Sequence, residues 1–215
     1  MDADSYRHSA AEAAADEVRA GMAIGYGTGR AAFAALEALA RRKVDVRGVP
    51  TSERTADLCR RLGLALTTLD ESPRLDLTLD GADEIDPDKQ VIKGGGGAHV
   101  REKLVALASR RRIFIVEESK LVSRLGSTRG VPVALVPFGA SATLARIATL
   151  FPGVKMREER SDDGAALADV PLAPGADLHQ VALTLKSIAG VIDHGLFLDL
   201  SPEVFAGGPQ GVRRL

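Results

Sequence analysis

The stretch Leu75–Leu104, LDLTLDGADEIDPDKQVIKGGGGAHVREKL, contains the residues that decide the fold. Leucines at 75, 77 and 79 alternate with Asp76 and Thr78, and this period of two predicts a strand. Three carboxylates then fall within the five residues of Asp80–Glu84. A second short strand ends in Lys93 and leads into four glycines and the start of a helix. Such an order of strands, loops and helices is typical of an α/β sheet.

The loops of this stretch carry groups suited to an anionic ligand and to proton transfer. The run Gly94–Gly97 has no side chains, so backbone N–H groups before the helix can approach a ligand closely. Lys93 adds a full positive charge, and Asp80, Asp83 and Glu102 supply carboxylates for proton transfer. Solvated turn residues and a flexible glycine loop are the alternative interpretation of each motif alone. Their combination at strand ends favours a site.

The rest of the first half continues the alternation of strands and helices. Helices are expected at about 5–20, 30–42 and 52–62, and strands at 22–24, 44–49, 64–66 and 113–116. The basic run Arg110–Arg112 is expected to be a solvated cap at a helix end. Ligands of parallel sheets bind outside the carboxyl ends of the strands. We expect four loops there: Gly25–Gly29, Asp80–Glu84, Lys93–Gly97 and the segment after Val116.

The pattern changes at about residue 128. Strands are expected at 131–136, 154–158, 165–170 and 191–200, with helices at 141–150 and 177–188. This β-α-β-β-α-β order is that of a ferredoxin-like domain. The predicted fold class is therefore α/β, with a Rossmann-like parallel-sheet domain and a smaller α+β ferredoxin-like domain. The expected boundaries are 1–127 plus 202–215 for the first and 128–201 for the second.

Composition excludes several classes of protein. The 215 residues are 45% hydrophobic and 27% charged with a net charge of −1, so no general attraction to nucleic acid or membranes is expected. Cys59 is the only cysteine and the four histidines are scattered, so we expect no metal site and no cofactor. No secretory signal or apolar run of about 18 residues is found, so a cytoplasmic location is expected.

The loop Gly25–Gly29 admits two interpretations. A dinucleotide fingerprint is one, with Asp45 near the distance of a ribose-binding acid, but Arg30 occupies the third glycine position. A cradle for a small anion at a helix N-terminus is the better one.

Together, DGADEID and KGGGGAHVREK resemble the signature of the ribose-5-phosphate isomerase A family. The loop Gly25–Gly29 and the segment Val116–Lys120, VEESK, are similar to two further family motifs, with agreement over about residues 7–125. The resemblance implies that Glu102 is the base that moves a proton between C2 and C1. It implies ring opening or hydroxyl proton transfer for Asp80, and orientation of the C1 and C2 oxygens for Asp83 and Lys93. A homo-oligomer, dimer or tetramer, is also implied.

The same resemblance implies which residues bind the substrate: Arg7, Thr28, Gly29, Arg30, Ala31, Gly81, Ala82, Gly94, Gly95, Gly96 and Lys120. Two positions depart from the family, because Arg30 and Ala31 stand where its GTGST loop has Ser and Thr. A guanidinium can still hold a phosphate. Arg7 stands where the family often has a phosphate-binding lysine.

The expected function is interconversion of ribose 5-phosphate and ribulose 5-phosphate through an enediolate, without a metal. Two alternatives remain open: a paralogous isomerase for another sugar phosphate or sugar acid, suggested by Arg30 and Ala31, and a non-catalytic sugar-phosphate sensor on the same fold. The absence of a basic arm and the retained carboxylates argue against the sensor.

Overall fold

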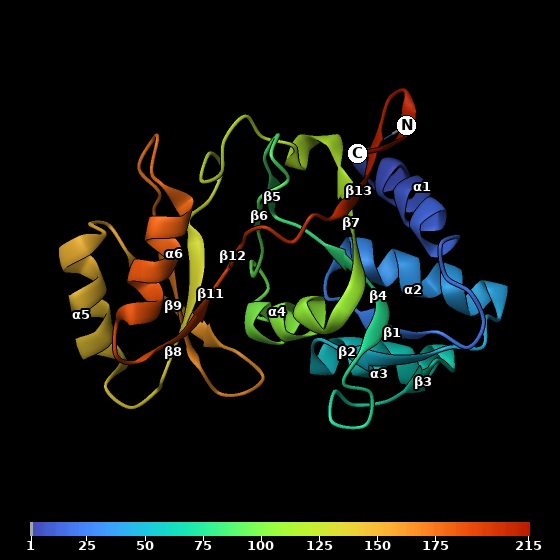
Figure 1. Ribbon diagram of the computed structural model, residues 1–215, viewed down its shortest axis with the longest axis horizontal. Coiled ribbons are helices and arrows are strands. Elements are labelled where there is room, and N and C mark those ends of the chain that lie inside the picture. The colour runs from blue at the N-terminus through green and yellow to red at the C-terminus, as the bar shows by residue number, and fades with distance from the viewer. Residues whose placement is uncertain (1) are drawn as a thin grey trace. The chain divides into compact units, whose positions relative to one another are not determined.

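The computed structural model describes residues 2–215 and divides into two compact units (Figure 1). The first unit contains the chain up to Ala82, then Arg101–Leu121 and Leu200–Leu215. The second contains Asp83–Val100 and Val122–Asp199.

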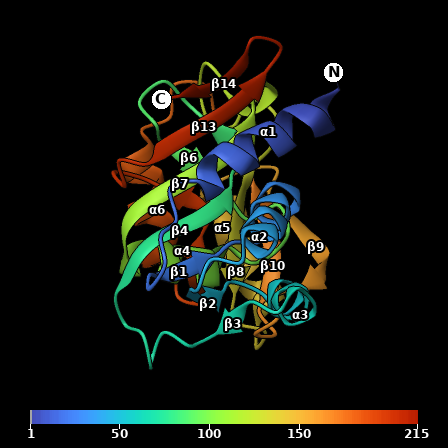
Figure 2. The ribbon, with the colours of Figure 1, turned by 90° about the vertical axis from the view of Figure 1, so that its right-hand side faces the viewer.

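Within the described residues, a seven-stranded sheet forms the centre of the first unit. Its strand order is β14-β13-β7-β4-β1-β2-β3 (Figure 2). All neighbouring strands are parallel except β14, which is antiparallel to β13. From β3 to β4 the order 3-2-1-4 is that of a Rossmann sheet. The strands are β1 Ala23–Tyr26, β2 Arg47–Pro50, β3 Ala65–Leu66, β4 Leu75–Gly81, β7 Ser109–Glu117, β13 Glu203–Gly208 and β14 Gly211–Arg214.

Helices cover both faces of this sheet. The helices α1 Ala3–Ala15, α2 Arg30–Arg42 and α3 Glu53–Leu62 share the main apolar core with the sheet. Helix α4 His99–Ala108 packs on the opposite face, because a Cβ on Gly25 would lie 2.3 Å from Val105. Helix α3 lies close to the expected range 52–62: the Ser52 hydroxyl caps it by accepting from Thr55 N, and Gly63 ends it in the left-handed region.

The second unit contains a four-stranded antiparallel sheet in the order β11-β8-β10-β9. Its strands are β8 Val131–Leu135, β9 Lys155–Arg160, β10 Ala166–Val170 and β11 Val191–His194. Helices α5 Ala140–Leu150 and α6 Leu178–Ser187 pack together on one face through Ile147, Val181 and Leu185. The βαββαβ order and this arrangement of strands are those of a ferredoxin-like fold. The predicted fold class is thus confirmed in both parts.

A three-stranded sheet in the order β12-β6-β5 also belongs to the second unit, and it corrects two expectations. Its strands are β5 Glu84–Ile85, β6 Val91–Ile92 and β12 Leu196–Phe197. The glycine run therefore follows a strand of this antiparallel sheet, not of the parallel one. The predicted strand at 191–200 is also broken, because Gly195 crosses the Lys93 backbone so closely that a Cβ there would lie 2.1 Å from Lys93 O.

The predicted helix cap at Arg110–Arg112 is wrong. These residues lie in β7, which begins at Ser109. Arg111 donates to Glu203 at 2.7 Å and to Glu17 at 2.7 Å, and the Arg112 Nε donates to Ala106 O. The Glu203 carboxylate accepts hydrogen bonds from Arg111, and these lower its pKa although partial burial raises it. The basic run thus connects β7 to β13 and to the segment after α1.

No helix of residues 2–215 is both long enough and apolar enough to cross a membrane.

Candidate active site

The first glycine loop lies at the carboxyl end of β1, at the N-terminus of α2. Gly29 has φ +107° and is the N-cap of α2, so the chain turns there in a conformation that suits glycine. Gly27 lies against β4: its N–H donates to Leu79 O at 2.9 Å, and a Cβ on it would lie 2.3 Å from the Asp80 carboxylate. Because Gly27 has no side chain, the backbone of the loop lies directly against the Asp80 carboxylate.

Thr28 connects this loop to the first turn of α3. Its Oγ1 lies 2.7 Å from Thr51 Oγ1, 2.8 Å from Ser52 Oγ and 2.9 Å from Thr55 Oγ1. Thr51, Ser52 and Thr55 are buried, and the Thr55 hydroxyl also donates to Gly27 O. The N-cap region of α3 thus also supports the glycine loop. The N-termini of α2 and α3 meet at Thr28.

Asp80 is a buried residue near the carboxyl end of β4. Its Oδ1 accepts the Thr28 N–H at 3.1 Å and the Gly81 N–H at 2.7 Å. These two backbone donors fix the orientation of the carboxylate. Two other predicted binding residues, Gly81 and Ala82, follow it directly and are half-buried.

Arg30 and Ala31 open α2 beside this carboxylate. Ala31 is half-buried, and its methyl group lies 3.6 Å from the Cβ position of Gly81. Arg30 is exposed, and no side chain of residues 2–215 forms an ion pair with it. The long cation is therefore available to a ligand from solvent.

Two further predicted cations lie near the end of β7. Arg7 of α1 is buried, and it donates to Glu117 Oε1 at 2.5 Å and to Asp4 Oδ1 at 2.6 Å. Burial lowers the pKa of Arg7, but these two carboxylates outweigh it, and the pKa is raised. Lys120 ends the short helix η1 Glu118–Lys120 and is half-buried.

Asp83, another predicted site residue, belongs to the second unit. Its Oδ2 accepts the Gly95 N–H at 2.7 Å, and its Oδ1 pairs with Arg129 at 2.8 Å. A Cβ on Gly95 would lie 1.9 Å from the Arg129 guanidinium. The glycine is needed because Arg129 reaches Asp83 across it.

Glu84 and Arg129 are functional candidates that sequence reasoning missed. Glu84 is fully buried, and its carboxylate accepts the N–H groups of Gly126 at 2.6 Å, Thr128 at 2.5 Å and Arg129 at 3.1 Å. It holds the loop that presents Arg129 to Asp83. No local pattern connects these residues, since Glu84 lies 45 positions before Arg129.

Lys93 is buried at the end of β6, and its ammonium lies 5.8 Å from the centre of the Phe197 ring. Its backbone N–H donates to Gly195 O at 2.9 Å, which fixes its place beside β12. Gly94, with φ +105°, turns the chain after it, and Gly95 and Gly96 are exposed. A Cβ on Gly96 would have open space around it, with no contact within 4 Å.

Helix α4 begins at His99 and carries Glu102 in its first turn. Both side chains are buried. The His99 Nε2 lies 3.4 Å from Asp193 O. Among residues 2–215, no group of three or more His, Cys, Asp or Glu side chains could hold a metal ion.

Asp45 lies outside the candidate site. It precedes β2, and its carbonyl accepts from Gly21 N. A ribose-binding acid belongs at the carboxyl end of that strand. The interpretation of Asp45 as such an acid is therefore wrong.

Known proteins resemble this chain over its whole length. Residues 47–211 match the family model described as ribose 5-phosphate isomerase A (phosphoriboisomerase A). The ribose-5-phosphate isomerase A of Caulobacter sp. (strain K31) is 47% identical, covering 100% of this chain and 99% of its own. That of Roseiflexus castenholzii is 45% identical, covering 100% and 97%.

Solved structures agree with these sequence matches. The ribose 5-phosphate isomerase A of Methanocaldococcus jannaschii has a TM-score of 0.92 at 30% identity, covering 98% of each chain. A D-ribose-5-phosphate isomerase in complex with phospho-erythronic acid has a TM-score of 0.95 at 29% identity, covering 100% of this chain and 99% of its own. Fold, motifs and full-length identity lead to one conclusion: the chain belongs to the ribose 5-phosphate isomerase A family.

Proposed function

We propose that this protein interconverts ribose 5-phosphate and ribulose 5-phosphate as an aldose–ketose isomerase. The observation that carries the proposal is its identity of 47% over the full length with a relative of that name. Both signature loops, Asp80–Glu84 and Lys93–Gly97, are intact. Incubation of the purified protein with ribose 5-phosphate, followed by detection of the ketose, tests it.

The reaction requires an open-chain sugar, a base that moves a proton between C2 and C1, and stabilisation of an enediolate. Glu102 is the proposed base, as the resemblance implies. Asp80 is assigned to ring opening or hydroxyl proton transfer, and its two backbone donors support this by holding one carboxylate oxygen in place.

Asp83 and Lys93 are assigned to orienting and polarising the C1 and C2 oxygens. Both oxygens of Asp83 already have donors, Gly95 N–H and Arg129, so an orienting role suits it better than proton transfer. Lys93 supplies the positive charge that an enediolate needs.

The phosphate is assigned to the loop Thr28–Ala31 together with Arg7 and Lys120. The Thr28 hydroxyl is enclosed by three other hydroxyls, so the loop backbone and the Arg30 guanidinium supply the donors that remain for a phosphate. A homo-oligomer and a cytoplasmic location complete the proposal and rely on the resemblance alone.

Lys93→Ala is expected to lower kcat much more than Lys120→Ala. Lys93 adjoins the glycine run, where charge develops in the transition state, whereas Lys120 contributes binding that is equal in the ground and transition states. Lys120→Ala should therefore act mainly on KM. Steady-state kinetics of the two variants make the comparison, and the opposite order would exchange the two roles.

Arg30→Ala is expected to raise KM for ribose 5-phosphate about tenfold, because a charge-assisted pair with phosphate contributes roughly 1.5–3 kcal/mol. Activity on unphosphorylated ribose should change little. Combining Arg30→Ser with Ala31→Thr restores the family's loop and should recover activity on the phosphate ester. The matched control is Arg54→Ala, which removes an exposed arginine of α3 that lies over Phe33.

An unchanged KM in Arg30→Ala would remove Arg30 from the phosphate site. If the wild type fails on ribose 5-phosphate but converts another sugar phosphate or sugar acid, the paralogous isomerase replaces this proposal.

A further inference from the structure

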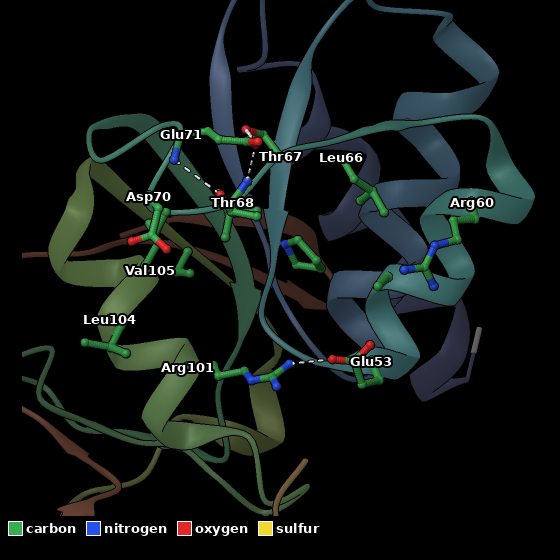
Figure 3. Close-up of a pocket in the computed structure, with 14 residues that line it drawn as sticks. Glu53, Arg60, Leu66, Thr67, Thr68, Asp70, Glu71, Arg101, Leu104 and Val105 are labelled. Atoms are coloured by element: carbon green, nitrogen blue, oxygen red, sulfur yellow. Dashed lines mark hydrogen bonds and ion pairs between the residues drawn. The ribbon is translucent and has the colours of Figure 1, made fainter. Parts of the chain in front are cut away.

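A cavity of the first unit lies beyond the carboxyl ends of β2 and β3 (Figure 3). Its volume is about 620 Å³, which lies within the range of small-molecule sites. Val49 and Pro50 at the end of β2 line it, together with Leu66 at the end of β3, and α3 and α4 form its walls. This is the edge of the sheet where α/β proteins bind ligands.

The lining of this cavity combines apolar and charged side chains. Half of the 14 lining residues are aliphatic or proline, including Leu66, Leu69, Leu104 and Val105. The lining has no Asn, Gln or His. The hydroxyl of Thr67 is already within 3.0 Å of Glu71. These apolar side chains would bury the apolar area of a flat heterocycle.

The charged groups of the cavity have both signs. Figure 3 shows Arg101 and Glu53 facing each other across one end, with Arg60 on α3 directed toward the cavity. Arg101 pairs with Glu53 at 2.9 Å, with side chains 30% and 62% exposed. Arg60 pairs with Asp57 at 2.6 Å, and both are about 60% exposed. The Arg60–Asp57 pair is exposed, and exposed pairs contribute little to stability, so a ligand anion can replace Asp57 at small cost.

The acidic groups of the cavity suit a ligand that carries ribose hydroxyls. Glu53 follows the end of β2 by three residues, close to the position of the acid that accepts ribose hydroxyls in nucleotide-binding α/β sheets. Glu71 is held by its own loop, since it accepts from the Thr67 hydroxyl and from Thr68 N. The cavity thus offers an apolar floor, acceptors for hydroxyl or amino groups, and the guanidinium groups of Arg60 and Arg101.

We propose that this cavity is a binding site for a nucleoside monophosphate, separate from the glycine loop assigned to the substrate. The base lies against the apolar floor, and the phosphate takes Arg60 and Arg101. The site goes beyond the proposed isomerisation and does not depend on it.

Calorimetric titration of adenosine monophosphate into the full chain tests the proposal, in the absence and presence of saturating phospho-erythronic acid. Saturable binding is expected in both, because the two sites are separate. Adenosine and inorganic phosphate alone should bind at least about tenfold more weakly, since each lacks half of the recognised groups. If the protein fails to convert ribose 5-phosphate, the titration without phospho-erythronic acid still tests this cavity.

Arg60→Ala is expected to weaken the binding of adenosine monophosphate about tenfold, by loss of a charge-assisted hydrogen bond. Because Arg60 is exposed, the variant should fold normally. Arg61→Ala is the matched control: Arg61 is the next residue of α3, is exposed and does not line the cavity. Displacement of the nucleotide by phospho-erythronic acid, no binding, or equal affinity in Arg60→Ala would each overturn the proposal.

Discussion

Glu102→Gln should lower kcat for ribose 5-phosphate by about 100-fold or more while leaving the fold intact. Gln has the shape of Glu but cannot take the proton that must move between C2 and C1. Glu102 is buried in the first turn of α4, so a change of volume would disturb the helix, whereas this substitution keeps the volume. Steady-state kinetics and thermal unfolding measure the two effects separately.

Glu12→Gln is the matched control, because Glu12 is an exposed carboxylate of α1 outside the candidate site. It should keep both activity and unfolding temperature. A Glu102→Gln protein with wild-type kcat would show that another group is the base, and Asp80 would be the next candidate.

Sequence patterns predicted correctly those strands and helices whose boundaries depend on neighbouring residues. The alternation of leucines at 75, 77 and 79 became β4, and all three side chains are buried. Helix α3 lies close to the predicted range 52–62, because Ser52 and Gly63 satisfy its end groups locally. Likewise, helix α2 begins at Arg30, directly after Gly29, whose positive φ suits glycine.

The predictions of the strand at 191–200 and of the cap at Arg110–Arg112 were wrong because residues distant in the sequence determine these two structures. Leu196 and Phe197 are apolar like Val191 and Ile192, so the segment 191–200 reads as one strand. The break comes from Lys93, about 100 residues earlier, whose backbone occupies the space beside Gly195. Arg111 lies in a strand because Glu17 and Glu203 accept its guanidinium there, and neither partner is a neighbour in the sequence.

The candidate site shows the same division. Asp80, Asp83 and the glycines were recognised because their motifs are contiguous. The reasons for the glycines were not visible: Gly27 makes room for Asp80 and Gly95 makes room for Arg129. Glu84 was seen only as part of an acidic run, although its carboxylate organises the loop at 126–129. Roles of this kind depend on partners that only the folded chain brings together.

Gly27→Ala should both destabilise the protein and abolish most of its activity. A Cβ at this position would lie 2.3 Å from Asp80 Oδ1, 2.4 Å from Asp80 Cγ and 2.5 Å from Leu79 O. Leu79 O is backbone of a central strand and cannot move, so the Asp80 carboxylate must leave its place. Overpacking of a buried site costs about 1–3 kcal/mol. Chemical denaturation measures the loss of stability, and kcat for ribose 5-phosphate measures the displacement of Asp80.

Gly81→Ala provides the matched control for stability, because it also adds one methyl group next to Asp80. Its Cβ would meet the Ala31 methyl at 3.6 Å and Ile115 O at 3.8 Å, which are ordinary contacts. The free energy of unfolding of Gly81→Ala should therefore stay within about 0.5 kcal/mol of the wild type. If Gly27→Ala is as stable as Gly81→Ala and keeps the wild-type kcat, then Asp80 does not need the position it takes against Gly27, and its assignment to ring opening fails with it.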